Sequence, residues 1–356
     1  MTRVLLTLLV AIMVAAILAL GACRVEAGAP APGFTLKLAS SLPASASPAL
    51  ATAWWAREVE KRSNGVVKFE YFWGGSLTKG GVELEFTQSG VTDVAVANAT
   101  VYPDKLPLLN IGLPVFFGIA DMDVLAKVYE TVLKHPAMLD DVERYNVKFI
   151  FPAPPGTKDL ASKEPVKAVR DLKGKRISTI GKWYPKAVAA IGGVAVTQEA
   201  PEKYLALQTG LVDSTIFSME AIYTFKLHEI CKHATWLGMG AEIVGTTIVN
   251  RDVWNRLPSD VQRIMMETGQ EAARWNAKNV TEMRDKAKTE MLKAGVTFYD
   301  LPYEEKAKWA SAMDNYPAQW AKEMDAKGRP GTELMRLLLD TSKKLGHKFP
   351  KEWLGQ

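Results

Sequence analysis

The stretch from Asp171 to Asp213 decides the fold. It opens with Asp171-Leu172-Lys173-Gly174-Lys175-Arg176-Ile177-Ser178 and closes with Tyr204-Leu205-Ala206-Leu207-Gln208-Thr209-Gly210-Leu211-Val212-Asp213. β-rich runs at 176–180 and 194–196 alternate with helix-forming runs at 185–191 and 202–208. Gly210 falls where a helix C-terminus needs a residue that tolerates positive φ. The stretch therefore predicts a β-α-β-α unit, which brings polar groups to strand ends where open α/β sheets bind small molecules.

The same alternation extends upstream and downstream of this unit. Strands are predicted at 34–40, 66–72 and 92–96, with helices at 48–64 and 82–88 between them. This βαβαβ order indicates a parallel sheet. Further strands are predicted at 147–151, 158–162, 241–250 and 296–300, and a helix at 122–134. The run Pro152-Ala153-Pro154-Pro155-Gly156 breaks the pattern and is the predicted crossing point between two lobes.

A long helix is predicted to start in the segment after Leu257 and to run from Ser259 to Ala294. Apolar residues recur at helical spacing through this segment, and Ser259 and Gln262 have the spacing of a capping box. About 36 unbroken residues would span roughly 54 Å, which is enough to cross both lobes. Two more helices, at 303–326 and 331–345, are predicted to close the chain.

The N-terminus has the pattern of an export signal. Arg3 precedes an uncharged apolar run from Val4 to Leu20, and Leu20-Gly21-Ala22-Cys23 resembles a bacterial lipobox. We expect lipidation at Cys23 and a tether over 24–33. Simple cleavage near Ala22 or Ala27 is the alternative, and so is a permanent membrane anchor, although the run is short for one.

Composition limits the classes of function. The 356 residues carry a net charge of +5, spread along the chain, which gives no footprint for nucleic acid. The two cysteines are Cys23 and Cys231, so a chain cleaved at Cys23 has no internal pair left to form a disulfide within the fold. The sequence also lacks the Gly-x-Ser-x-Gly, Walker A and His-Glu-x-x-His motifs of common enzyme classes.

The opening stretch also carries a family resemblance. Its pattern D-L-K-G-x-x-I, followed by Y-x-A-L-Q-x-G-x-V-D, resembles the solute-binding proteins of tripartite ATP-independent periplasmic (TRAP) transporters. The run Leu113-Pro114-Val115-Phe116-Phe117 is similar to another element of that family. The resemblance implies a two-lobed periplasmic-binding-protein-like α/β fold with mixed or parallel sheets and a long bridging helix.

The resemblance also implies a division of the chain and a set of partners. Residues 34–152 plus about 244–280 would form domain I, and residues 153–243 plus about 281–356 would form domain II. The protein would bind a small organic molecule in the periplasm or at the cell surface, and would deliver it to membrane permease subunits. It would need no cofactor, would perform no catalysis, and would close its lobes by a hinge motion.

A two-lobed binder holds its ligand between the carboxyl ends of strands from both lobes. The candidate ligand-binding residues are therefore the polar and aromatic residues predicted at those ends. Turns, helix caps or core packing are the alternative explanation for each of them taken singly. The candidates are Ser40, Ser41, Trp73, Asn98, Lys158, Ser178, Lys182, Trp183 and Phe217.

The chain departs from the TRAP pattern at the position of a ligand-binding arginine. The family motif ends in an arginine that grips a ligand carboxylate, and here that position is Ser178. Lys158, Lys182 or Arg176 could supply the cation instead. Further on, an acid and an amide of the family pattern are replaced by Ile216 and Phe217. We therefore expect a less polar pocket, suited to an aromatic or otherwise apolar organic acid.

Two other functions are compatible with these patterns. One is a secreted enzyme on the same scaffold, assisted by a metal bound to His228, Cys231 and His233; a partly buried helix end is the simpler explanation of that segment. The other is a ligand-sensing lipoprotein that signals to a membrane partner.

Overall fold

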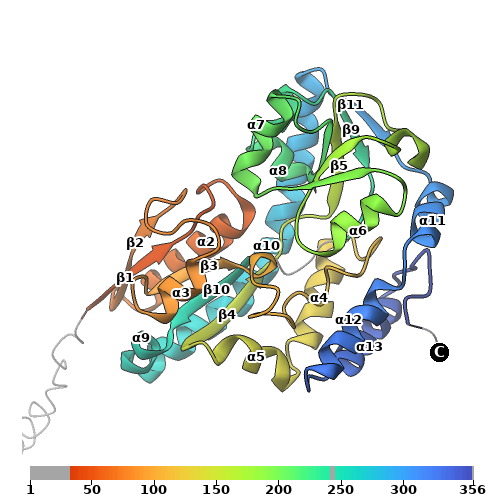
Figure 1. The fold of residues 1–356 in the computed structure, drawn as a ribbon. Helices are drawn as coiled ribbons and strands as arrows, with labels where there is room; N and C mark the ends of the chain where they lie inside the picture. The colour runs from red at the N-terminus through yellow and green to blue at the C-terminus, as the bar shows by residue number, and fades with distance from the viewer. Residues whose placement is uncertain (1–32, 241–244, 355–356) are drawn as a thin grey trace, which may run out of the picture.

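The computed structural model describes residues 33–240 and 245–354 as two β-sheets surrounded by helices (Figure 1). The α/β fold predicted from the sequence is confirmed, with a mixed sheet in each lobe. The lipobox with Cys23, and residues 241–244 of the predicted strand, lie outside the described residues.

The first sheet has the strand order β2-β1-β3-β10-β4. Strands β1, β2 and β3 are parallel, as predicted. Strand β10 comes from much later in the chain and runs antiparallel between β3 and β4. The bounds are β1 Phe34–Ala39, β2 Val67–Phe72, β3 Val94–Asn98, β4 Val147–Ala153 and β10 Gly245–Asn250.

The second sheet has the strand order β11-β9-β5-β8-β6-β7. Strands β6, β7 and β8 are parallel, whereas β5 runs antiparallel to β8 and to β9. Strands β6 and β7, from the unit at 171–213, thus supply one edge of this sheet. The bounds are β5 Lys158–Ser162, β6 Arg176–Thr179, β7 Val194–Thr197, β8 Ser214–Ser218, β9 His233–Trp236 and β11 Thr297–Asp300.

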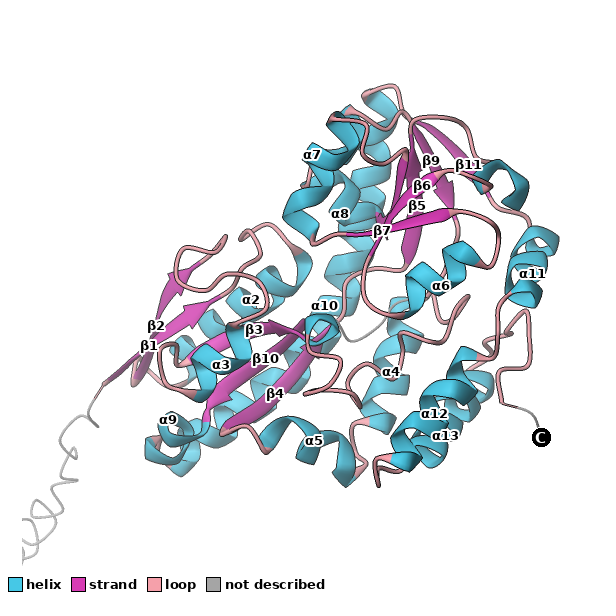
Figure 2. Ribbon diagram, viewed as in Figure 1, coloured by secondary structure: helices cyan, strands magenta, loops and turns pink. Residues whose placement is uncertain are grey.

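The predicted long helix is α10, which runs unbroken over 35 residues from Ser259 to Lys293. It packs against α2 and β4 beside the first sheet and against α8 beside the second, so it connects the two halves (Figure 2). The other helices are α2 Ser47–Arg62, α3 Glu83–Gln88, α4 Met122–Val132, α5 Pro136–Glu143, α6 Trp183–Ala189, α7 Lys203–Gln208, α8 Met219–Thr224, α9 Arg251–Arg256, α11 Tyr303–Ala312, α12 Tyr316–Ala326 and α13 Gly331–Lys344.

Two predictions about helix ends were wrong. The single helix predicted at 303–326 is two helices, because Asn315 caps the start of α12 by accepting a hydrogen bond from Ala318 and Pro317 begins a new first turn. The capping box at the start of α10 does not form. Gln262 instead donates to the carbonyls of Trp254 and Leu257 at the end of α9.

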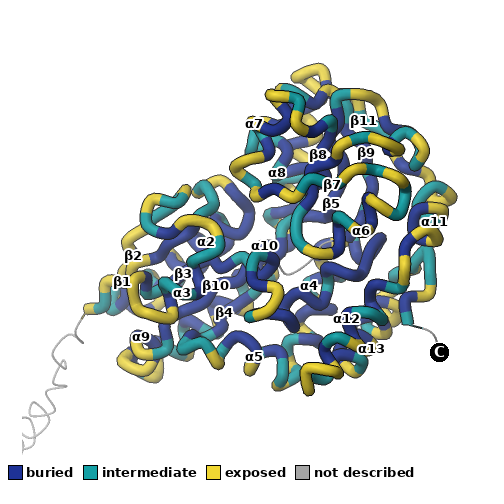
Figure 3. Tube along the Cα trace, in the orientation of Figure 1, coloured by how far each residue is buried: buried dark blue, intermediate teal, exposed yellow. Residues whose placement is uncertain are grey.

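Buried apolar residues fill the space between sheets and helices, while the exposed segments are mainly loops and outer helix faces (Figure 3). Beside the first sheet, the fully buried Trp55 on α2 contacts Phe69 and Phe151, and its indole Nε1 donates to the Met265 carbonyl 2.9 Å away on α10. This contact holds the long helix against the first lobe.

Candidate functional site

Strand ends of the two sheets face each other across a cavity of about 480 Å³. In the first sheet, Asn98 ends β3 and pairs with Gly245, which starts the antiparallel β10. In the second sheet, Ser218 ends β8 and pairs with Lys158, which starts the antiparallel β5. In each sheet, the end of one strand thus lies beside the start of its antiparallel neighbour. Residues from both of these places line the cavity.

The exposed wall of the cavity is mostly apolar. Aliphatic and aromatic side chains come from both lobes, and charged side chains are interspersed among them. A cavity of this size and character is typical of a small-molecule site. The apolar lining includes Leu42, Ala46, Pro48, Val96, Val101, Pro155, Ile180, Pro201, Phe217 and Phe225, and the charged lining is Lys79, Glu83, Lys158, Glu199, Glu202 and Glu220.

Four of the residues predicted from the sequence line this cavity: Ser41, Asn98, Lys158 and Phe217. Ser41 donates through its hydroxyl to Glu83, and the Asn98 Oδ1 accepts from the backbone N–H of Thr100 at 3.0 Å. Lys158 is 1% exposed, and its Nζ lies 3.5 Å from the Gly156 carbonyl. The cavity therefore has a buried cation at the junction of the two lobes.

The other five predicted residues are not among those that line the cavity. Ser40 turns back to accept from the Leu42 N–H, and Trp73 stacks on Tyr71. Trp183 packs against Tyr316 of α12. The remaining two, Lys182 and Ser178, have partners elsewhere: Lys182 forms an ion pair with Glu323, and Ser178 is buried beside Lys203.

Arg176 also points away from the cavity. Its guanidinium donates to both carboxylate oxygens of Asp213, at 3.1 and 2.7 Å, on the exposed side of the second sheet. This pairing occupies the Nε–Nη2 edge of the guanidinium, and Arg176 is not among the residues that line the cavity. Arg176 therefore does not replace the arginine of the family pattern in this arrangement.

Lys203 is a buried cation that the sequence analysis missed. It starts α7, has no exposed surface, and donates from Nζ to the Ser178 Oγ at 2.7 Å. Its Nζ also lies 5.3 Å from the ring centre of Phe217, which lines the cavity. Lys203 thus brings a positive charge next to Ser178, the position at which the family pattern has its arginine. It lies behind Phe217, which forms part of the cavity wall.

Burial lowers the pKa of Lys203 to about 7, with the Glu199 carboxylate opposing this shift and the Lys158 ammonium adding to it. The lysine of the unfolded chain has a pKa of about 10.4. Between pH 7 and this value, the lysine is protonated to a greater extent in the unfolded chain than in the folded protein. The free energy of unfolding therefore rises with pH across this range. The cost of burying the charged lysine is therefore fully present below pH 7.

We compare the free energy of unfolding of Lys203→Met with that of the unmodified chain. The difference should favour the variant most at about pH 6 and least at about pH 10. Denaturant unfolding of both proteins at several pH values measures the difference. Lys182→Met, which replaces an exposed lysine, is the control. A stability difference that stays constant over this pH range would show that Lys203 does not titrate as described.

Four acidic residues of the cavity were also missed: Glu83, Glu199, Glu202 and Glu220. Glu83 is fully buried, and burial raises its pKa. Glu220 is 3% exposed and lies in the first turn of α8, two residues past the end of β8. Its Oε1 accepts from the Gly156 N–H at 2.8 Å and from the Ser218 hydroxyl at 2.6 Å. Glu199 lies on the turn before α7. The position of Glu220, three residues after the candidate Phe217, is the one signal that sequence reasoning could have used.

The segment considered for metal binding is divided between different elements. His228 lies in a short 3-10 turn, with its ring centre 5.1 Å from that of Tyr223, whereas His233 begins β9. Burial raises the pKa of the Cys231 thiol to about 12. Within residues 33–240 and 245–354, no three histidine, cysteine, aspartate or glutamate side chains are grouped so that they could hold a metal ion. His228, Cys231 and His233 are therefore not brought together as the ligands of one metal ion.

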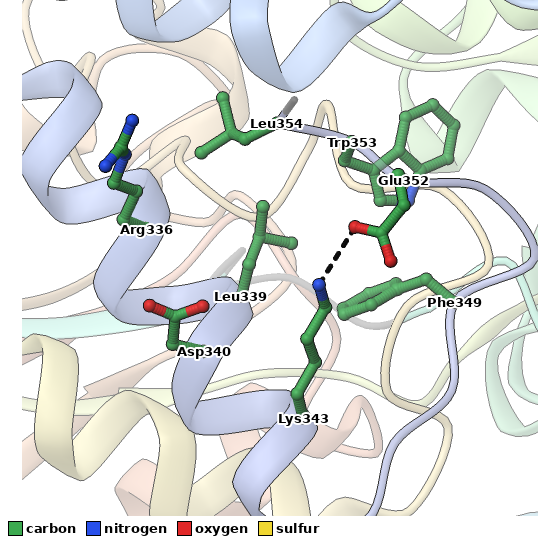
Figure 4. Close-up of a pocket in the computed structure, with 8 residues that line it drawn as sticks. All are labelled: Arg336, Leu339, Asp340, Lys343, Phe349, Glu352, Trp353 and Leu354. Carbon is green, nitrogen blue, oxygen red and sulfur yellow. Dashed lines mark hydrogen bonds and ion pairs between the residues drawn. The ribbon is translucent and has the colours of Figure 1, made fainter. Parts of the chain in front are cut away.

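A second cavity, of about 340 Å³, lies between α13 and the segment 349–354. Figure 4 shows that its charged side chains come from α13 and from this segment, with Lys343 Nζ paired to Glu352 at 2.9 Å. This cavity is remote from the strand ends and involves neither sheet. Its lining residues all come from 336–354, whereas the cavity between the lobes is lined by residues from both sheets.

Residues 38–323 match the model of a protein family described as bacterial extracellular solute-binding protein, family 7. The chain belongs to this family. It is thus a solute-binding protein of the TRAP transporter type. The chain is 27% identical over 276 residues to the C4-dicarboxylate-binding periplasmic protein of Rhodobacter capsulatus, covering 75% of this chain and 80% of that protein. It is 25% identical over 291 residues to a solute-binding protein of Albidiferax ferrireducens, covering 81% and 84%.

Solved structures of TRAP solute-binding proteins share the fold. A Bordetella pertussis receptor that binds pyroglutamic acid superposes with a TM-score of 0.77 at 18% identity, over 87% of this chain and 100% of that one. A Desulfovibrio salexigens protein with bound orotic acid gives 0.76 at 23% identity, over 88% and 99%. Members of the family are periplasmic receptors. In this receptor, none of the helices described is long and apolar enough to cross a membrane.

Proposed function

We propose that this TRAP receptor captures a small organic acid, with an apolar or aromatic body, in the cavity between its lobes and delivers it to membrane permease subunits. The observation that carries the proposal is the mostly apolar cavity of about 480 Å³ with the buried Lys158 at the junction of the lobes. An apolar wall favours the body of such a ligand, and a buried cation favours its carboxylate.

The replacement of the family arginine supports this ligand class. Lys158 and Lys203 are both buried, and each presents a point charge rather than a planar fork. Such charges suit one carboxylate group without fixing its plane. The C4-dicarboxylate, pyroglutamate and orotate ligands named for relatives are all acids, which agrees with a cation at this place.

The proposal includes a division of the chain and an attachment to the membrane. Residues 34–152 plus about 244–280 would move as one lobe and residues 153–243 plus about 281–356 as the other, closing over the ligand by a hinge at the crossings. Lipidation at Cys23 would hold the receptor at the membrane surface near its permease. Nothing in the described residues favours the sensing alternative over transport.

A thermal-shift panel tests the proposal. We expect at least one carboxylate among pyroglutamate, orotate, succinate, benzoate and phenylacetate to raise the unfolding temperature of the mature receptor by several degrees, because a ligand that binds only the folded state stabilises it. The corresponding amides serve as controls and should have little effect. The absence of a shift with every carboxylate tested, including carboxylates that also carry an amine, would contradict the proposal.

A further inference from the structure

The charges on the cavity wall do not match a ligand that is only an anion. Of the lining residues in the described part of the chain, four are glutamates and two are lysines. Lys203 adds one cation behind the wall, and still leaves acids in excess. Burial raises the pKa of Glu83 and Glu199, which lessens their negative charge. A carboxylate ligand would still be repelled by those glutamates of the wall that are ionised, since like charges brought together in a low-dielectric site are costly.

Glu220 is the glutamate of the cavity wall that has a buried carboxylate oxygen without a hydrogen-bond partner among the described residues. Its Oε1 accepts hydrogen bonds from the Gly156 N–H and the Ser218 hydroxyl, whereas its Oε2 is buried without a hydrogen-bond partner among the described residues. Leaving a buried carboxylate oxygen unpaired carries a substantial free-energy cost. Such a cost is expected to be offset in a functional state of the protein, by a donor that arrives with the ligand.

The surrounding backbone holds Glu220 at this place. A Cβ added to Gly156 would lie 2.7 Å from Oε2, so only glycine leaves room for this carboxylate beside the crossing segment. Glu83, on the opposite lobe, differs: its two oxygens already accept from the Ser41 hydroxyl and the Gly81 N–H. Glu220 is thus the acid of the wall that is both fixed in position and short of a donor.

We propose that the ligand of this receptor carries a protonated nitrogen in addition to its acid group, and that Glu220 accepts a hydrogen bond from that nitrogen. The inference rests on the proposed function and narrows its ligand class. Glu220 and Lys158 are neighbours, because both contact Gly156 and because Ser218, which donates to Glu220, pairs with Lys158 in the sheet. In this proposal a lysine binds the acid group and Glu220 binds the nitrogen. A zwitterion with an apolar body satisfies both charges and the apolar wall.

Matched probe pairs test this inference by calorimetric titration of the mature receptor. Each pair shares a carbon skeleton with and without an amine: phenylalanine and 3-phenylpropanoate, leucine and 4-methylpentanoate, norvaline and pentanoate. We expect the amine-bearing member of at least one pair to bind about tenfold more tightly, since a hydrogen bond between charged groups is worth about that factor. Glu220→Gln should remove this preference and leave the affinity for the amine-free member nearly unchanged.

The outcomes separate the inference from the proposed function. Equal affinities within every pair, or binding of panel acids but of no amine-bearing probe, would overturn the inference and leave the receptor function standing. Binding of no acid at all would overturn both. Glu130→Gln, at an exposed glutamate on α4, is the control for loss of a carboxylate away from the cavity. The probe pairs decide the question with the unmodified chain even if Glu220→Gln folds poorly.

Discussion

Replacing Lys158 with methionine is expected to weaken binding of the tightest carboxylate ligand about 100-fold. Lys158 lines the cavity, is 1% exposed, and begins β5 where the two lobes meet. A charged hydrogen bond to a ligand carboxylate in so buried a place contributes about 1.5–3 kcal/mol. Methionine keeps most of the side-chain volume, so the loss reflects the charge and not a void.

Lys182→Met is the matched control for this experiment. Lys182 is an exposed lysine of the same lobe, pairs with Glu323, and does not line the cavity. Isothermal titration of both variants with the same ligand should show a loss in the first only. Equal affinities for the Lys158 and Lys182 variants would remove Lys158 from the site and leave Lys203 as the cation that holds the acid group.

Replacing Trp55 with alanine should lower the free energy of unfolding by about 4 kcal/mol. Its side chain has no exposed surface, packs against Phe69 and Phe151, and its Nε1 donates to the Met265 carbonyl on α10. Alanine would leave a cavity and an unpaired carbonyl at the contact that holds the long helix on the first lobe. Buried tryptophan-to-alanine changes cost about 3–5 kcal/mol.

Trp54→Ala is the neighbouring control. Trp54 is only partly buried and stacks on Trp275 with ring centres 5.6 Å apart. Denaturant unfolding should show a clearly smaller loss for this variant, on the order of 1 kcal/mol. If the two alanine variants lost equal stability, the Trp55 contact would not be the main attachment of α10 to the first lobe.

The fold could be predicted because its signals are local. The strand and helix periods of 171–213, the break at Pro152–Gly156 and the long apolar pattern after Leu257 each lie within one segment. The break between α11 and α12 was missed because Trp309 and Trp320 continue an apolar helical pattern across it, whereas the Asn315 cap and Pro317 act on only a few residues.

The cavity could be predicted only in part. Ser41 and Asn98 follow or end strands of the first sheet, as the strand pattern predicted. Lys158 also lines the cavity, but it lies at the amino end of β5 and not at a carboxyl end, because β5 runs antiparallel to β8. Lys182 and Trp183 follow the next strand end, but the chain turns them toward α12, far along the sequence. Lys203 reaches Ser178 from the start of a helix, and such a contact depends on tertiary packing that no local pattern encodes.

Native mass spectrometry of the mature receptor, purified without unfolding, tests the central claim most directly. We predict a 1:1 complex with a small carboxylate, retained from the cells or formed with an acid of the panel, that is lost on denaturation and diminished by Lys158→Met. A mass of the protein alone, unchanged by every acid added, would contradict the assignment of the cavity between the lobes as the site of an organic acid.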